Sequence, residues 1–67
     1  MDVLIDLPDL LSKLKFVSYS HYQLEEVEQQ VSITLYTTQR AIRYQITHPL
    51  TSDKQSEVSY LLEHYRS

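Results

Sequence analysis

The stretch VSITLYTTQRAIRYQI, residues 31–46, decides the fold because it alternates apolar and polar side chains on both sides of a short polar segment. Alternation with a period of two is typical of a β-strand with one buried face. The pattern predicts two strands whose apolar sides face a common core. The apolar residues are Val31, Ile33 and Leu35 in the first strand and Ile42, Tyr44 and Ile46 in the second.

The segment between these strands must form a turn in a chain that contains neither Gly nor Asn. If both apolar rows share one face, Leu35 lies opposite Ile42, and the loop has an even number of residues. A two-residue turn at Thr38-Gln39 favours Gly or Asn, because its central residues need positive φ. The sequence therefore predicts a four-residue loop, Thr37 to Arg40, with negative φ at its centre.

The C-terminal part of the chain carries the pattern of an amphipathic helix. Pro49 ends the second strand, and Ser52 and Gln55 have the spacing of a capping box. The sequence predicts a helix over residues 52–65. Its apolar stripe is Val58, Leu61, Leu62 and Tyr65.

A second helix is predicted near the N-terminus, over residues 7–15. Asp6 can accept the first free N–H groups, Pro8 fits the first turn, and leucines recur at helical spacing. Residues 1–5 fit either a leading helical turn or a short strand.

The segment between this helix and residue 31 is ambiguous. Residues 15–23 are rich in β-forming side chains and favour a strand, followed by an acidic loop. Leu24, Val27 and Val31 also have helical spacing, so a short helix over residues 21–30 is the rival interpretation.

Together these elements predict one small α+β domain over residues 1–67. Its order is α-β-β-β-α, with both helices packed on one face of an antiparallel meander sheet. The alternative is α-α-β-β-α, with the short helix near residues 21–30. The opposite face of the sheet should be polar, with Ser32, Thr34, Tyr36, Arg43, Gln45 and Thr47.

Composition excludes several classes of protein. The chain has 67 residues, a formal charge of −3, no Cys and no Gly. Disulfides are therefore impossible, and the Gly-dependent phosphate and dinucleotide loops are excluded. The longest apolar run, Val3-Leu4-Ile5, is far shorter than a membrane span of about 20 residues or a signal-peptide core. We expect a cytoplasmic protein with no membrane partner.

No residue pattern predicts a catalytic, cofactor or metal site. His21, His48 and His64 are too far apart in sequence for a zinc motif. Asp53 and Glu57 lie one helical turn apart, a spacing that more often marks a solvated helix face than paired catalytic carboxylates. We expect no enzyme activity and no cofactor.

The candidate interaction face consists of Tyr36, Arg40, Arg43 and Gln45. Tyr and Arg are enriched at the centres of protein interfaces. We therefore expect a small protein–protein interaction or regulatory module that forms a homodimer through this face or through a strand edge. The alternative is a nucleic-acid-binding module that uses Tyr36, Arg40 and Arg43. The negative net charge opposes it, because phosphate binding requires a basic surface.

Overall fold

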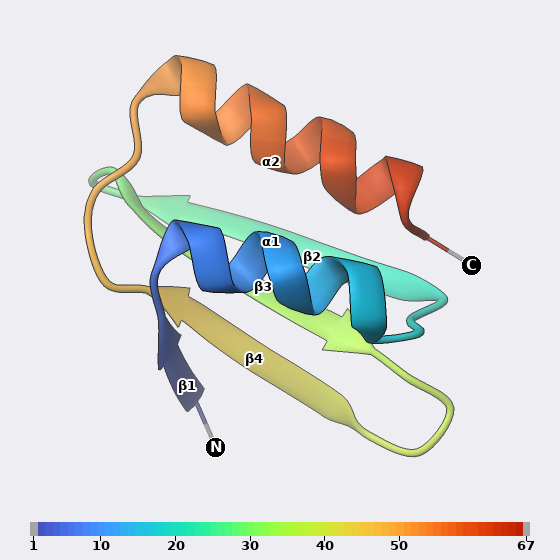
Figure 1. Cartoon of the computed structure of the whole chain (residues 1–67). Coiled ribbons are helices and arrows are strands. Elements are labelled where there is room, and N and C mark those ends of the chain that lie inside the picture. Colours follow the sequence, from blue (N-terminus) through green and yellow to red (C-terminus); the bar gives the residue numbers. More distant parts are fainter. Residues whose placement is uncertain (1, 67) are drawn as a thin grey trace.

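The structure, a computed structural model, describes residues 2–66 and shows a small α+β fold (Figure 1). The predicted order of helix, three strands and helix is confirmed, and a further strand precedes it. The rival helix near residues 21–30 is wrong, because most of that segment is a strand. The elements within the described residues are β1 (Asp2–Ile5), α1 (Leu7–Phe16), β2 (His21–Val27), β3 (Gln30–Tyr36), β4 (Ala41–Ile46) and α2 (Ser52–His64).

The strands form one sheet in the order β1-β4-β3-β2. Strands β2, β3 and β4 are the predicted antiparallel meander. Strand β1, which the sequence left open between helix and strand, lies parallel to β4, with Val3 opposite Tyr44 and Ile5 opposite Ile46. The complete sheet is therefore mixed, and its two outer strands are β1 and β2.

The predicted four-residue turn between β3 and β4 is confirmed. Leu35 lies opposite Ile42, and residues 37–40 connect the strands. The Thr37 hydroxyl accepts hydrogen bonds from the backbone N–H groups of Gln39 and Arg40 and donates to the Arg40 carbonyl oxygen. No residue of this turn has positive φ. The Thr37 N–H also donates to the Arg40 carbonyl oxygen, so a backbone bond and a threonine side chain together hold a turn that lacks Gly and Asn.

The hairpin between β2 and β3 also turns without Gly or Asn, but it uses a shorter loop. Val27 pairs with Gln30, so Glu28 and Gln29 form a two-residue loop. Their φ angles are 53° and 70°, the positive values of a primed turn. Such values are unfavourable for residues other than Gly and Asn. Gln29 is held in place because its N–H donates to the Glu26 carboxylate and its carbonyl oxygen accepts from the Leu50 N–H.

The second strand both begins and ends later than the sequence predicts. The predicted acidic loop after residue 23 is wrong, since residues 24–27 continue β2. Residues 15–23 were expected to be extended, but α1 continues to Phe16 and β2 starts at His21. Between them, Tyr19 turns its side chain into the core, where it is 1% exposed. This burial, rather than strand pairing, explains the apolar character of the connection.

Both helices cover one face of the sheet, as predicted (Figure 1). Leu10 and Leu14 face the core from α1, and Val58 and Leu62 face it from α2. Leu61 and Tyr65, the other members of the predicted α2 stripe, are half-buried at its margin. The fully buried side chains are Leu10, Leu14, Tyr19, Val31, Ile33, Leu35, Ile46, Val58 and Leu62.

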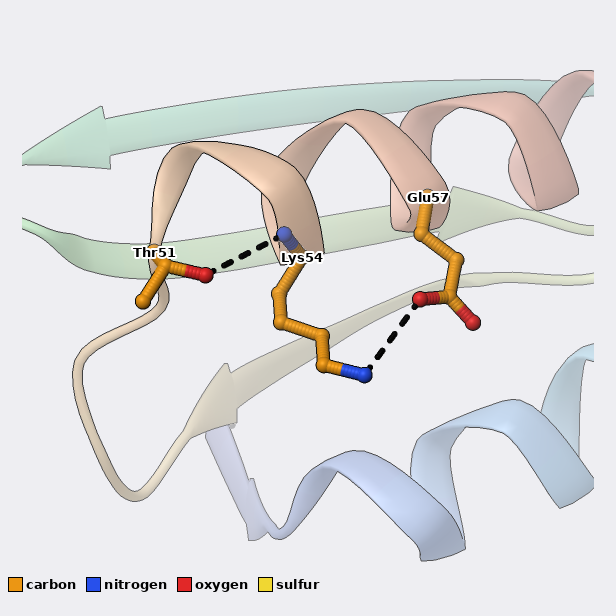
Figure 2. Close-up of polar contacts among 3 residues, drawn as sticks. All are labelled: Thr51, Lys54 and Glu57. Atoms are coloured by element: carbon orange, nitrogen blue, oxygen red, sulfur yellow. Dashed lines mark hydrogen bonds and ion pairs between the residues drawn. The ribbon is translucent and has the colours of Figure 1, made fainter.

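Side chains cap both helices at their N-termini. The Asp6 carboxylate accepts from the Asp9 N–H (3.0 Å), as predicted for α1. For α2 the cap is Thr51, not Ser52, because Thr51 is extended and its hydroxyl accepts from the Lys54 N–H (Figure 2). The helix therefore begins at Ser52 itself.

Candidate interaction surface

The predicted face lies on the side of the sheet that the helices leave uncovered. Arg43 is opposite Thr34 and Gln45 is opposite Ser32, while Tyr36 stands near the end of β3. Tyr36 is exposed, and Arg43 and Gln45 are half-buried. The structure thus places Tyr36, Arg43 and Gln45 on the same uncovered surface, which we call the open face.

The residues of the candidate face do not form one compact cluster. The Tyr36 hydroxyl donates to the Gln23 side-chain oxygen on β2 (3.3 Å), so this ring is tied toward β2. Arg43 lies on β4, on the other side of β3. Arg40 belongs to the β3–β4 turn and lines a hollow with Lys13 of α1. On the open face, Tyr36 therefore lies toward β2 and Arg43 and Gln45 lie on β4, whereas Arg40 lies apart from them near α1.

A second surface, which sequence reasoning missed, lies along β1. A groove of ≈ 740 Å³ runs between β1 and α1, and Val3, Leu4 and Phe16 are among its lining residues. These three side chains are 40%, 70% and 86% exposed. Exposed apolar residues that cluster, rather than being scattered singly, mark interaction sites. We call this surface the β1 groove.

The sequence carried only a partial signal for the β1 groove. Val3-Leu4-Ile5 is the longest aliphatic run in the chain, but a buried strand would produce the same run. Phe16 was expected on a strand, whereas it ends α1 and points to solvent. Only the tertiary structure brings the two segments together.

Positive charge adjoins the β1 groove. Lys13 lines it and also lines the neighbouring hollow, to which Arg40 contributes. Asp9 is the acidic residue at the groove itself. The groove therefore has an apolar floor flanked, among the described side chains, by Lys13 and Asp9, with Arg40 at the neighbouring hollow.

Two tyrosines link the sheet side of the core to the end of α2. The Tyr19 hydroxyl donates to the Leu62 carbonyl oxygen, and the Tyr22 hydroxyl donates to the Glu63 carboxylate, both at 2.7 Å. The rings of Tyr19 and Tyr22 meet edge to face, with centroids 6.3 Å apart.

The chemistry of these tyrosines is that of hydrogen-bond donors. Burial raises the pKa of Tyr19 above its ordinary value of 10.0. The hydrogen bond to the Glu63 carboxylate raises the pKa of Tyr22. Both hydroxyls remain protonated near neutral pH, so they hold α2 in place rather than act as bases or nucleophiles.

Within residues 2–66, no group of three or more His, Asp or Glu side chains is arranged to hold a metal ion. His64 instead stacks on Tyr60 and meets the edge of Tyr65. In the same part of the chain, neither helix combines the length and apolar character needed to cross a bilayer. Comparison of the chain with protein-family models, with curated proteins and with solved structures gave no match.

Proposed function

We propose that this protein is a small non-enzymatic module that binds another polypeptide, either a second copy of itself or a regulatory partner. The observation that supports the proposal best is the one-sided core. Both helices cover one face of the sheet, which leaves the open face and the outer edges of β1 and β2 uncovered (Figure 1). An uncovered strand edge can pair with another chain through its backbone groups.

Exposed apolar side chains at the β1 edge support the same function. Leu4 on β1 is 70% exposed, Phe16 at the end of α1 is 86% exposed, and both line the β1 groove. A chain of this size buries only about 60% of the surface of its unfolded state, so a bound partner would add burial that the monomer lacks. The absence of Cys fits the reducing cytoplasm, where we propose that the protein acts.

Affinity purification from the native host tests this function. The wild-type chain, immobilised at its C-terminus, is compared with Leu4→Ser and Tyr36→Ala, two exposed substitutions that leave the core intact. We expect a polypeptide that the wild type retains and that one of the variants loses. If no polypeptide, including free copies of the chain, is retained in a manner sensitive to either substitution, the proposed function is wrong.

Nucleic-acid binding is the second candidate, because Tyr36 and Arg43 share the open face. Aromatic rings and guanidinium groups both stack on single-stranded bases. The electrostatics are unfavourable, since the chain carries a formal charge of −3. Fluorescence anisotropy with labelled single-stranded RNA at low salt decides the matter. RNA binding that weakens with salt and is lost in Tyr36→Ala would favour this candidate. An anisotropy that does not change as protein is added would reject it.

A further inference from the structure

The two outer edges of the sheet differ in chemistry. At the β1 edge, the Ile5 carbonyl oxygen accepts from the Thr47 N–H and therefore faces β4. Because backbone groups alternate along a strand, the N–H and carbonyl of Leu4 point away from the sheet. Beside this edge lies the β1 groove, with its apolar floor, Lys13 and Asp9. The neighbouring hollow is lined by Lys13 and Arg40 and holds no carboxylate among its lining residues.

The β2 edge is acidic. Glu25 and Glu26 lie on the strand, Glu28 follows in the turn, and all three are exposed. Residues 21–30 contain no Lys or Arg. Val27, next to these carboxylates, is 67% exposed. The β2 edge thus offers an outer strand edge, an apolar side chain and a row of carboxylates, which complement the backbone edge of β1, Leu4 and the nearby cations.

We propose that copies of this chain associate head to tail, with the β2 edge of one copy seated on the β1 edge and groove of the next. This inference rests on the proposed function and names its partner as a second copy. The sheet continues across the contact through backbone hydrogen bonds. Glu26, which shares the helix-covered side of the sheet with its core neighbour Val31, lies toward Lys13 and Arg40. Val27, on the open face, contributes apolar area against Leu4 of β1.

Charge explains why unlike edges meet. Pairing β2 with β2 would place two rows of glutamates side by side, and pairing β1 with β1 would do the same for Lys13 and Arg40. Like charges that face one another across an interface oppose association. On α2, by contrast, opposite charges lie within one helix, since Lys54 pairs with Glu57 and Glu63 pairs with Arg66 near its C-terminal end.

A contact between two different edges also determines the size and strength of the assembly. A contact between unlike surfaces closes into a ring or continues as a chain of copies, rather than stopping at a symmetric dimer. Strand β1 has only 4 residues, so few backbone bonds can form across the contact. The association is therefore weak, and it weakens further as salt screens the charges.

Sedimentation velocity of the full chain, at protein concentrations from micromolar to millimolar and at low salt, tests the proposal. For the wild type we expect an average mass above the 8.0 kDa monomer that rises with concentration and falls when salt is added. Lys13→Glu blocks the β1 groove, and the double variant Glu25→Lys/Glu26→Lys blocks the β2 edge. Each variant should sediment as a monomer when it is alone.

Mixing the two blocked variants is the decisive step. The Lys13→Glu copy retains an intact β2 edge, and the double variant retains an intact β1 groove. The mixture should therefore form a complex of twice the monomer mass that grows no further. Lys15→Glu is the matched control, because it makes the same charge change in the last turn of α1 outside the β1 groove. It should associate like the wild type.

Three outcomes would overturn the proposal: a wild type that stays monomeric, blocked variants that still associate, or a mixture that stays monomeric although both variants melt like the wild type. A monomeric wild type that retains a different polypeptide from the host would reject self-association and leave the proposed function standing. If the wild type is monomeric and retains no polypeptide from the host, both the self-association and the proposed function are wrong.

Discussion

Removing the hydroxyl of Tyr19 should destabilise the fold by about 1–2 kcal/mol. Tyr19 is 1% exposed and donates to the carbonyl oxygen of Leu62, which is 0% exposed. This carbonyl lies in the last turn of α2, where the usual helical donors run out. The N–H of Arg66, which would complete the helical pattern, donates to the Glu63 carbonyl oxygen instead. The tyrosine hydroxyl therefore satisfies a buried acceptor that the helix leaves open.

The expected loss in the free energy of unfolding follows from the groups that remain after Tyr19→Phe. The ring still fills its place in the core, so no large cavity forms. The Leu62 carbonyl loses its partner while buried, and an unsatisfied buried group costs about 1–3 kcal/mol. The neighbouring residues Glu63 and His64 are exposed, so water can reach the end of α2 and partly replace the lost bond, which places the expected value in the lower part of that range. In a domain of this size, this corresponds to a fall in Tm of about 5–15 °C.

Thermal melts followed by circular dichroism, together with urea denaturation, measure this effect. The slope of the free energy with urea should stay unchanged, because the unfolded state exposes the same surface. Tyr60→Phe is the matched control, since Tyr60 lies on the same helix that Tyr19 contacts but is 68% exposed. It should melt like the wild type. A Tyr19→Phe protein that also melts like the wild type would refute the role assigned to this hydrogen bond.

Further predictions concern α2, the β2–β3 turn and alkaline pH. Leu62→Ala, at a fully buried position, should lower the free energy of unfolding, measured in urea, by about 2–5 kcal/mol. Leu61 is half-buried, so Leu61→Ala should lower it by clearly less. Equal losses would show that the buried side of α2 is misassigned. Gln29→Gly should raise the free energy of unfolding by about 0.5–1 kcal/mol, because φ at this residue is 70°; a lower Tm would contradict the assigned strain. The raised pKa of Tyr22 means that the native state keeps a proton that the unfolded state loses above about pH 10. The contribution of this hydrogen bond to the free energy of unfolding should therefore be fully present below pH 10 and be lost as pH rises further. In urea titrations at a series of pH values, Tyr22→Phe should make the fall in the free energy of unfolding shallower. An unchanged pH profile would argue against the hydrogen bond to Glu63.

The sequence by itself determined the elements whose apolar pattern is local. Residues 31–46 alternate with a period of two, and this pattern fixed both the strand faces and the pairing of Leu35 with Ile42. The Leu10 and Leu14 spacing in α1 and the Val58 and Leu62 spacing in α2 likewise required no knowledge of the partner elements. A one-sided core then followed, because each helix has one apolar stripe to bury.

Other features were decided by contacts between distant segments. Residues 2–5 became a strand because β4 offered them a free parallel edge, which no short sequence window can reveal. Glu28 and Gln29 accept positive φ because the pairing of β2 with β3, together with the bond from Leu50 to Gln29, fixes the turn. Local preferences of these residues point the other way.

The candidate interaction surface also has one part that the sequence predicted and one part that only the tertiary structure shows. Tyr36, Arg43 and Gln45 could be assigned to the uncovered face from alternation alone, because side chains on a strand point to opposite faces in turn. The β1 groove could not be foreseen, since it brings Val3 and Leu4 of β1 together with Phe16 at the end of α1. Periodicity within a segment is written in the sequence, whereas the neighbours of an edge strand are set only when the whole chain packs.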